Sequence, residues 1–600
     1  MKISGAIDSN AARAIALEGH GSGNVERRIP IVLEYAGLRS ARLALGVLLL
    51  FALVLLIYLP MLHGSFVMDD ARLVGPAANP LVNGQLTVGS VWFQTDFPLT
   101  LCVWRAEWLL WGDHPLGYHA VNMALQALSA VLIWRVLVRL NVRGAWLGAA
   151  IFAVHPVAVG SVARIAELKN TLSLPFFLLS FWAYLRYETA SLYPPREPSE
   201  KPPGFGAPNL FRAFATNSRN EFRAPIWFAL SFISFILALL SKTTVIALPV
   251  ALLGCAAWQR GRITRRDVAH TAPYFIVALA FGLMSIWFQK YQALAGEMVP
   301  SQTFAERLGV AGRNFWFYFG KALWPSNLTV FYSRWRTDHS LLAEMAPLLA
   351  IALLFAVCWR FRRGWGRHAL LGIGCFTLLL FPSLGFFDAQ CFTKFQVSDH
   401  LQYLPLIAMT SLIGAVLAAI PRRRIFFSGT VGVLAVMSLL SIKRAAIFAT
   451  EEGLLRDTLA KNSAAWPAHN DLGVILARQG KIPAAADQFK AALQSQPNEP
   501  EALANLAQCD AVQGRFAEAC GEYRQALRLK PDNAALHEGL AGALENLGHA
   551  AEATGHLKIA LRFAPKSSTR LSLAGLLYQT GDYRAATDQY RQVLSSEPDN

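Results

Sequence analysis

Residues 43–62 read LALGVLLLFALVLLIYLPML, a stretch without a single charged side chain. A helix of about 20 apolar residues has the length needed to cross ~30 Å of hydrocarbon. The stretch follows four arginines between positions 27 and 42, and no A-x-A cleavage pattern follows it. It is also longer than the apolar core of a signal peptide. We therefore expect a retained membrane anchor, with the N-terminal segment 1–42 in the cytoplasm.

The composition of the whole chain agrees with a membrane protein. Hydrophobic residues make up 54% of the chain and charged residues only 16%, whereas soluble domains carry about 25% charged residues. The net charge of +16 is unevenly placed, because residues 464–600 contain 13 Lys/Arg and 15 Asp/Glu. The positive excess lies instead at the ends of apolar runs, where it keeps loops in the cytoplasm. It indicates membrane topology, and we expect no nucleic-acid partner.

About eleven apolar runs are long enough to span a membrane. They lie near residues 43–62, 117–138, 144–159, 171–187, 225–241, 243–259, 269–288, 342–359, 369–385, 400–420 and 424–442. Every second loop between them is rich in arginine, as cytoplasmic loops are. An odd number of spans that starts inside ends outside. We therefore expect a polytopic domain at 43–443 in a bacterial inner membrane, with the rest of the chain in the periplasm.

The C-terminal part repeats with a period of 34 residues. Pro497, Pro531 and Pro565 follow this step, and Pro598 falls one residue short of it. Glycines, leucines and small residues recur in the same way: Gly480, Gly514, Gly548 and Gly581; Leu472, Leu506, Leu540 and Leu573; Ala485, Ala519, Ala553 and Ala586. A period of 34 is that of the tetratricopeptide repeat, a pair of helices that is stable only when stacked on its neighbours. We expect a helical linker at 444–465 and four repeats at 466–600, which makes the whole chain all-α.

Two adjacent carboxylates follow the first span, in the sequence GSFVMDDARLV. Asp69 and Asp70 lie at the predicted outer mouth of the membrane, where unpaired charges are costly. One of them is suited to removing a proton from an acceptor hydroxyl. A solvated acid pair that opens a loop is the alternative.

Further polar residues are predicted on the same membrane face. Each of them alone is more often a packing residue, but together they provide acids, histidines and cations under one large outer loop: Asp96, His119, His155, Arg164, Lys169, Lys242, Asp399 and His400. Cations suit the charge that builds on a departing phosphate. The set favours a reaction between a lipid-linked anion and a hydroxyl acceptor.

Several of these stretches resemble the transmembrane-and-tetratricopeptide-repeat O-mannosyltransferase family, within the C-type superfamily of lipid-dependent glycosyltransferases. The matching stretches are FVMDD with the later Asn79-Pro80, Asp96-Phe97, PLGYHAVNMAL, FAVHPVAVGSVARIAELKNTL, LLSKTTVIALPVALL, SDHLQYLPLIAM and IFATEEGLLRDTLAKN. The chain departs from the family pattern at Gly160, Arg164, Asn170 and Asp399-His400.

The resemblance implies an inverting transfer of one sugar, mannose or a similar hexose, from a polyprenyl-phosphate carrier to a protein hydroxyl. It makes Asp69 or Asp70 the base, and Lys169, Lys242, Arg164 and His400 candidates to bind the lipid phosphate. It implies no obligatory metal or cofactor, and it assigns the repeats to the acceptor polypeptide.

Two other functions compete with this hypothesis. One is a non-catalytic envelope scaffold whose repeats recruit partners, and the other is a polysaccharide polymerase or ligase that uses a diphosphate-linked donor. Replacement of Asp69 and Asp70 by asparagine separates them, because only the glycosyltransferase needs the early acid pair.

Overall fold

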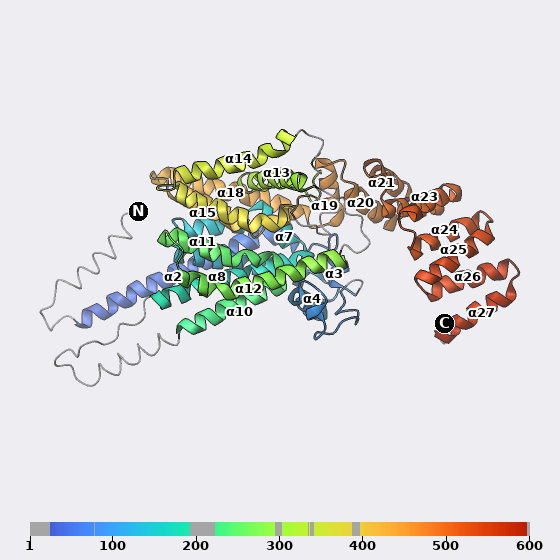
Figure 1. The fold of residues 1–600 in the computed structure, drawn as a ribbon, viewed down its shortest axis with the longest axis horizontal. Coiled ribbons are helices and arrows are strands. Elements are labelled where there is room, and N and C mark those ends of the chain that lie inside the picture. The colour runs from blue at the N-terminus through green and yellow to red at the C-terminus, as the bar shows by residue number, and fades with distance from the viewer. Residues whose placement is uncertain are drawn as a thin grey trace.

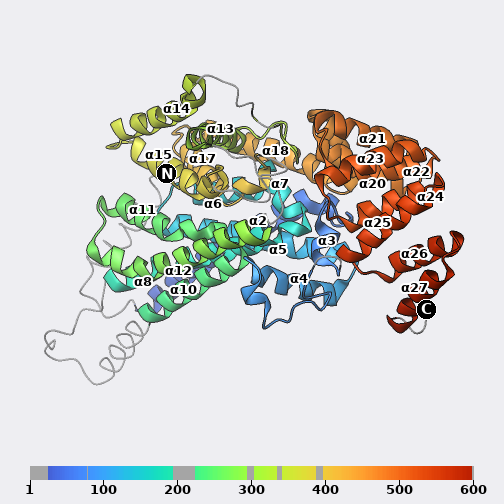
Figure 2. The ribbon, with the colours of Figure 1, turned by 45° about the vertical axis from the view of Figure 1, so that its right-hand side comes forward.

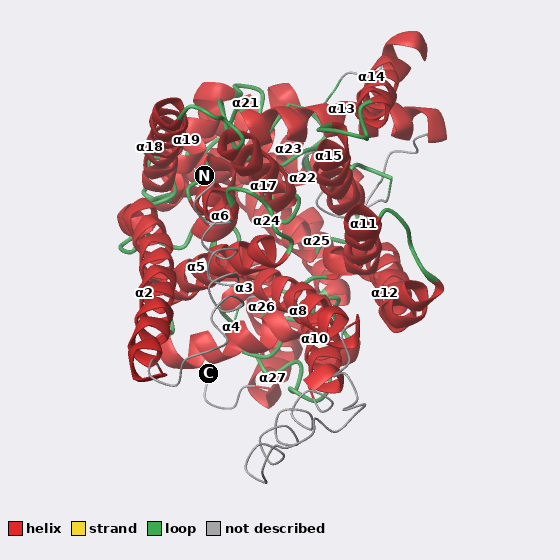
Figure 3. Cartoon of the chain, turned by 90° about the vertical axis from the view of Figure 1, so that its left-hand side faces the viewer, coloured by secondary structure: helices red, strands yellow, loops and turns green. Residues whose placement is uncertain are grey.

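The computed structural model describes residues 25–76, 79–192, 223–293, 303–333, 335, 341–386 and 396–596. Every regular element within these residues is a helix, and Figure 3 draws no strand. This confirms the predicted all-α fold class. Residues 1–24 of the expected cytoplasmic segment and Pro598 lie outside the described residues.

The membrane domain is a bundle of long helices that run mostly along the long axis of the molecule (Figure 1). These helices are α2 (Val25–Tyr58), α4 (Pro98–Trp111), α5 (Pro115–Arg139), α8 (Leu168–Leu192), α10 (Arg223–Ser241), α11 (Leu248–Arg260), α12 (Arg265–Phe288), α13 (Phe304–Leu323), α14 (Leu341–Arg360), α15 (Gly366–Leu380), α17 (Leu406–Ala418) and α18 (Arg423–Ile447). Short helices interrupt them: α3 (Asp70–Val74), α6 (Ala145–Ala153) and α7 (Pro156–Ala163).

The expected number of spans needs a correction. Seven helices among the described residues are long and apolar enough to cross a membrane, and a bent pair raises the number to eight. The seven are Ser40–Met61, Pro115–Arg139, Ala224–Ser241, Thr243–Arg260, Arg265–Gln292, Ala343–Arg360 and Arg423–Ile447. The other expected spans are helical in whole or in part, but they do not meet both conditions.

Local features of the chain explain why the other expected spans do not meet both conditions. The expected span 144–159 is broken into α6 and α7 with a bend of 56°, because Pro156 has no N–H to continue the hydrogen-bond ladder. The span expected at 400–420 is helical only from Leu406, and α15 ends at Leu380, just before a turn that contains Pro382. Helix α8 is long enough, but the stretch expected to span, 171–187, contains Arg186 and several hydroxyl-bearing side chains, which lower its hydropathy.

A close contact between α6 and α17 compensates for their short lengths. A Cβ atom on Gly414 would lie 2.6 Å from the backbone nitrogen of Gly148, so only glycine fits there. Such contacts between small residues are typical of helices that pack in membranes. The two short helices are therefore held by direct backbone packing.

The repeats follow a linker helix, α19 (Glu451–Lys461), and consist of four helix pairs. The pairs are α20 (Trp466–Arg478) with α21 (Ile482–Ser495), α22 (Pro500–Val512) with α23 (Phe516–Leu529), α24 (Ala534–Asn546) with α25 (Ala550–Phe563), and α26 (Ser567–Gln579) with α27 (Tyr583–Ser596). Each recurring glycine adopts a positive φ between its two helices, from 76° at Gly480 to 84° at Gly581. The recurring alanines are buried where the helices of a pair touch.

The repeats begin at the end of the bundle where α3 and α4 lie, and they curve away from it (Figures 1 and 2). Helix α18 continues to Ile447, so the boundary expected at 443/444 falls inside a helix. The linker helix α19 starts anew at Glu451 after a turn at 448–450, and the side chain of Thr450 caps its first turn.

Candidate active site

The acid pair lies in the loop that follows α2. Asp69 is exposed, whereas Asp70 is the first residue of α3 and is fully buried. The Oδ2 atom of Asp70 accepts a hydrogen bond from the N–H of Val67 at 3.1 Å, and its Oδ1 atom accepts one from the N–H of Ala166 at 2.7 Å. Asp70 therefore ties two loops together, while Asp69 is the acid that can meet a substrate.

The environment of Asp70 also changes its ionisation. Burial raises the pKa of Asp70 to about 6, although Arg164 and the N–H groups of Ala166 and Val67 favour the charged form. Desolvation always disfavours the charged form of a carboxyl group, and a nearby cation opposes it. At neutral pH Asp70 is consequently an anion in the vicinity of Arg164.

Glu167 is the centre of a second group of buried charges. It ends the 3-10 turn η3 (Ile165–Glu167), and its Oε1 atom lies 3.6 Å from Arg164 Nη1, 3.8 Å from Lys169 Nζ and 3.7 Å from His400 Nε2. Asn170 Nδ2 donates a hydrogen bond to Oε2 at 2.7 Å. Burial alone would raise the pKa of Glu167, but His400, Lys169 and Arg164 outweigh it and lower the pKa to about 2.

Asn170 joins this group to two distant parts of the chain. Its Oδ1 atom accepts a hydrogen bond from Lys242 Nζ, and its Nδ2 atom lies 3.4 Å from the carbonyl oxygen of His400. Lys242 precedes η4 (Thr243–Ala247), and His400 belongs to η7 (Asp399–Gln402). We call these six residues the Glu167 cluster: Arg164, Glu167, Lys169, Asn170, Lys242 and His400. Around Glu167 itself two cations, Arg164 and Lys169, face one carboxylate, and Lys242 joins the cluster through Asn170, an arrangement suited to an added anion.

Asp96 lies at the edge of this cluster. Its Oδ2 atom is 3.4 Å from both Ser285 Oγ and Gln289 Nε2, and its buried Oδ1 atom has no hydrogen-bond partner within the described residues. Burial raises the pKa of Asp96, and Gln289 and Lys169 oppose that shift. Lys169 is therefore close enough to interact with both Asp96 and Glu167.

Asp399 and His400 are consecutive but have different partners. His400 faces Glu167, and its Nδ1 atom lies 2.8 Å from Ser398 Oγ. Asp399 instead accepts a hydrogen bond from the hydroxyl of Tyr332 at 2.8 Å. The structure thus brings His400, and not the carboxylate of Asp399, into direct contact with Glu167.

The other two predicted histidines make no hydrogen bond to the Glu167 cluster in the described part of the chain. His155 caps α7, because its Nδ1 accepts from the N–H of Val157 at 3.3 Å and its Nε2 lies 3.2 Å from the carbonyl oxygen of Ala322. Both ring nitrogens of His155 are therefore engaged by the backbone. His119 is buried in α5, and neither ring nitrogen has a hydrogen-bond partner among the described residues.

Asn122, which lies in α5 three residues after His119, makes two side-chain hydrogen bonds near Glu167. Asn122 Nδ2 donates to the carbonyl oxygen of Arg164 at 3.3 Å, and its Oδ1 accepts from the hydroxyl of Thr171 at 2.5 Å. These bonds tie Asn122 to the backbone of Arg164 before Glu167 and to the side chain of Thr171 after it.

Glu451, at the start of the linker helix, was not predicted as a site residue. Its Oε1 atom accepts a hydrogen bond from the N–H of Met68 at 2.8 Å, and Met68 has a φ of +54°, which is unusual for a residue with a side chain. Ser65 N–H also donates to the carbonyl oxygen of Ala449 at 3.0 Å. The linker to the repeats therefore holds the loop that carries the acid pair.

Comparisons with known proteins agree with a membrane part followed by tetratricopeptide repeats. A family model described as tetratricopeptide repeat matches residues 452–500, 470–533 and 505–568. The chain is 32% identical over 150 residues to the protein O-mannosyl-transferase Tmtc1 of Drosophila melanogaster. This match covers 23% of this chain and 18% of the relative. It is 23% identical over 498 residues to the protein O-mannosyl-transferase TMTC4 of Mus musculus. This longer match covers 71% of this chain and 63% of the relative.

These matches cover less than two thirds of either relative's length. Among solved structures, the chain is similar to MamA 41-end from Desulfovibrio magneticus RS-1, with 15% identity and a TM-score of 0.24 over 27% of this chain and 93% of that chain. The resemblance predicted from the sequence is confirmed by the relatives and by the repeat model: the chain is similar to O-mannosyl-transferases of the TMTC type, and its C-terminal part contains tetratricopeptide repeats.

Proposed function

We propose that this chain is a membrane glycosyltransferase that moves a mannose or similar hexose from a polyprenyl-phosphate carrier to a protein hydroxyl. The observation that carries the proposal is the pairing of an exposed carboxylate, Asp69, with a neighbouring group of cations around Glu167. Asp70 connects the two, because it adjoins Asp69 and binds the N–H of Ala166 beside Glu167. The similarity to proteins named as O-mannosyl-transferases supports the same class of reaction.

The proposed reaction divides the work between the acid pair and the cations. The acceptor hydroxyl gives its proton to Asp69, and its oxygen forms a bond to the anomeric carbon of the sugar. The bond between that carbon and the phosphate oxygen of the carrier breaks at the same time, so the configuration inverts. Polyprenyl phosphate leaves as an anion, which Lys169, Lys242 and Arg164 stabilise. Asp70 acts as a positioning residue, since both of its oxygens bind backbone N–H groups.

The repeats are proposed to hold the acceptor polypeptide on the non-cytoplasmic side of a bacterial inner membrane. The hydrogen bond between Glu451 and Met68 joins the start of the linker helix to the acid loop, which supports a peptide on the first repeats reaching the site without crossing the membrane. The positive-inside pattern of the loops supports the periplasmic orientation.

The test is sugar transfer in membranes that contain the full chain, supplied with a radiolabelled polyprenyl-phosphate mannose. Asp69→Asn is expected to lower the rate by about 10²–10⁴-fold, the usual contribution of a positioned base. Asp113→Asn is the matched control, because Asp113 is an exposed acid in the loop between α4 and α5, and it is expected to retain the wild-type rate.

Two results would contradict the proposal. Unchanged transfer by Asp69→Asn shows that Asp69 is not the base. Transfer only from a diphosphate-linked donor, equally fast in Asp69→Asn, favours a polymerase or ligase, which has no use for the early acid pair. Absence of transfer by the wild-type chain, together with retention of a repeat-bound partner by Asp69→Asn, favours the scaffold.

A further inference from the structure

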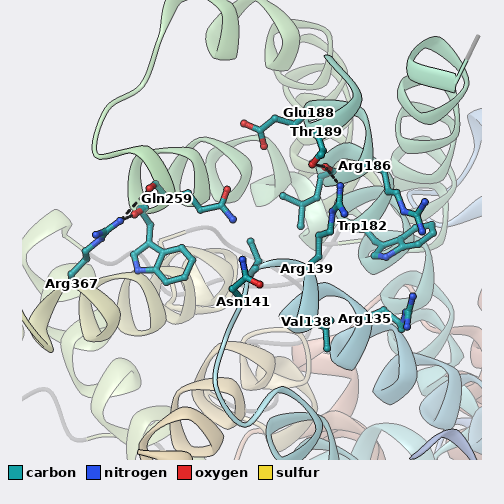
Figure 4. A pocket seen from close by; sticks show the side chains of 13 residues that line it. Arg135, Val138, Arg139, Asn141, Trp182, Arg186, Glu188, Thr189, Gln259 and Arg367 are labelled. Atoms are coloured by element: carbon teal, nitrogen blue, oxygen red, sulfur yellow. Dashed lines mark hydrogen bonds between the residues drawn. The ribbon is translucent and has the colours of Figure 1, made fainter. Parts of the chain in front are cut away.

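A polar cavity is lined by residues of α5, α8, α11 and α15 (Figure 4). Its volume is about 760 Å³, within the range of about 300–1,000 Å³ that is usual for small-molecule sites. It is lined by Arg135, Val138, Arg139, Leu140, Asn141, Trp182, Leu185, Arg186, Glu188, Thr189, Trp258, Gln259 and Arg367. Neither the proposed sugar transfer nor the resemblance uses any of these residues.

The cavity and the Glu167 cluster lie at opposite ends of the same helices. Helix α5 places Asn122 beside Arg164 near its first turns and contributes Arg135 and Arg139 to the cavity in its last turns. Helix α8 likewise begins with Lys169 and ends near Thr189. A helix of 25 residues such as α5 is about 37 Å long at 1.5 Å per residue, and this exceeds the ~30 Å of hydrocarbon. The cavity therefore opens at the other membrane surface.

Positive charge dominates the cavity wall. Arg135, Arg139, Arg186 and Arg367 contribute to it, against one carboxylate, Glu188. That carboxylate is already paired with Arg260, whose guanidinium also binds Asp267 at 2.6 Å. Within the described ranges, Arg135, Arg139 and Arg367 form no ion pair with a carboxylate. The wall therefore has a surplus of positive charge that an anion would balance.

The guanidinium groups are held in place before any ligand arrives. That of Arg186 lies 4.7 Å from the ring centre of Trp182 and 5.0 Å from that of Trp227. Arg139 Nη2 donates to the carbonyl oxygen of Leu185 at 3.5 Å. The guanidinium group of Arg367 lies 5.8 Å from the ring centre of Trp258 and donates to the carbonyl oxygen of Gln259 at 3.4 Å (Figure 4). Planar guanidinium groups fixed in this way bind phosphate oxygens in pairs.

We propose that this cavity binds the phosphate headgroup of an anionic phospholipid from the leaflet at that surface. Basic pockets between membrane helices are suited to such headgroups. The wall also contains the rings of Trp182 and Trp258, and tryptophan favours the boundary between headgroups and hydrocarbon. Val138, which lines the cavity and is 49% exposed, offers an apolar surface to the first part of an acyl chain. A soluble phosphate ester shares the phosphate chemistry but does not use the apolar part of the wall.

The experiment measures lipid binding by the full-length protein after delipidation in a neutral detergent. Native mass spectrometry compares phosphatidylglycerol with phosphatidylcholine of the same acyl chains, and glycerol 1-phosphate is the soluble probe. We expect the protein to prefer phosphatidylglycerol. A basic residue near an anionic lipid surface contributes about a five-fold gain in affinity, so the double variant Arg135→Gln/Arg367→Gln is expected to bind it about 25-fold more weakly.

The control is the double variant Arg422→Gln/Arg423→Gln. It removes the same charge from two exposed arginines that do not line the cavity, and it is expected to bind phosphatidylglycerol as the wild type does. Wild-type binding by the Arg135/Arg367 variant overturns the proposal. The proposal is also overturned if the wild-type protein binds phosphatidylglycerol and phosphatidylcholine with equal affinity, a comparison that needs no variant. Binding of glycerol 1-phosphate as tight as that of phosphatidylglycerol assigns the cavity to a soluble phosphate ester instead.

Discussion

Replacing Glu167 by glutamine removes the carboxylate on which the cations of the site converge. Glutamine has the same shape, and its carbonyl oxygen can still accept the hydrogen bond from Asn170 Nδ2. The loss is therefore mainly one of charge, and it leaves Arg164 and Lys169 without the anion that lies within 3.8 Å of each.

The pKa of Glu167 gives the magnitude of this loss. A fall from 4.5 to about 2, at about 1.4 kcal/mol per unit, corresponds to about 3 kcal/mol of stabilisation of the ionised form. Removal of one partner from a buried ion pair typically costs about 3–5 kcal/mol, which agrees. Because the folded-state pKa lies below the unfolded one, this stabilisation is fully present above pH ~4.5 and is lost as the pH falls through about 2.

The assay is urea unfolding in a mild detergent at several pH values. Glu167→Gln is expected to lower the free energy of unfolding by about 3 kcal/mol at pH 7, and the difference from the wild type is expected to shrink below pH ~4.5. Glu452→Gln is the control: Glu452 forms a solvent-exposed pair with Arg456 at 2.8 Å, and such pairs contribute about 0–1 kcal/mol.

Inorganic phosphate provides an internal check on the same variant. The cations left by Glu167→Gln should attract phosphate, which binds the folded state and stabilises it. We expect phosphate to raise the urea midpoint of the variant more than that of the wild type. A variant as stable as the wild type at pH 7, with no added response to phosphate, would refute the assignment of Glu167 as the central counter-ion.

Three further predictions concern the loop, the packing and the linker. Asp70 has a folded-state pKa of about 6 against 3.8, so the wild type is expected to lose about 3 kcal/mol of unfolding free energy as the pH rises from 4 to 7; Asp70→Asn should lack this part of the pH dependence in urea titrations. Gly414→Ala places a Cβ atom 2.6 Å from the backbone nitrogen of Gly148 and is expected to cost about 1–3 kcal/mol, visible as a lower urea midpoint. Glu451→Ala leaves the N–H of Met68 without its acceptor, at a cost of about 1–3 kcal/mol; sugar transfer should fall while circular dichroism of the repeats is unchanged.

The repeats could be predicted from the sequence almost residue by residue, because their contacts are local. Gly480 needs a positive φ between the two helices of its pair, and Ala485 is fully buried a few residues later. Both requirements recur every 34 residues and depend only on neighbouring helices. The 34-residue period is therefore sufficient to predict the helix pairs and the turn between them.

The membrane part was less predictable, because hydropathy reports burial and not helix continuity. Residues 144–163 are apolar throughout except for His155 and Ser161, yet the chain bends by 56° within them. His155 stabilises that break by capping α7. The sequence placed His155 among the polar residues of the outer membrane face, whereas its two ring nitrogens contact the backbone.

Glu167 was missed as a central residue because its partners come from distant segments. Arg164 and Lys169 are close in sequence and were recognised as cations. His400, however, comes from η7, and Lys242 reaches the cluster through Asn170, 72 residues away. The periodicity of the sequence carries no information about contacts between segments that are distant in sequence. The one available signal was an acid between two cations in an otherwise apolar stretch, which is unfavourable in a membrane unless the charges pair.

The packing of the linker and the first repeat has a consequence for acceptor binding. The apolar core of the membrane helices continues through Leu455 into Leu472 and Phe489 of the first repeat and reaches Leu506 and Cys509 of α22, whereas the other core residues from Leu503 to Ala586 form a separate cluster. The linker is also tied to the outer loop, since Asn462 Nδ2 donates to the carbonyl oxygen of Phe331 at 3.1 Å. The first repeat is thus part of the same packed unit as the acid loop, and movement of the array relative to the site must occur beyond it. We therefore expect the first repeat to set the distance between a bound peptide and Asp69, and the later repeats to adapt to different acceptor sequences.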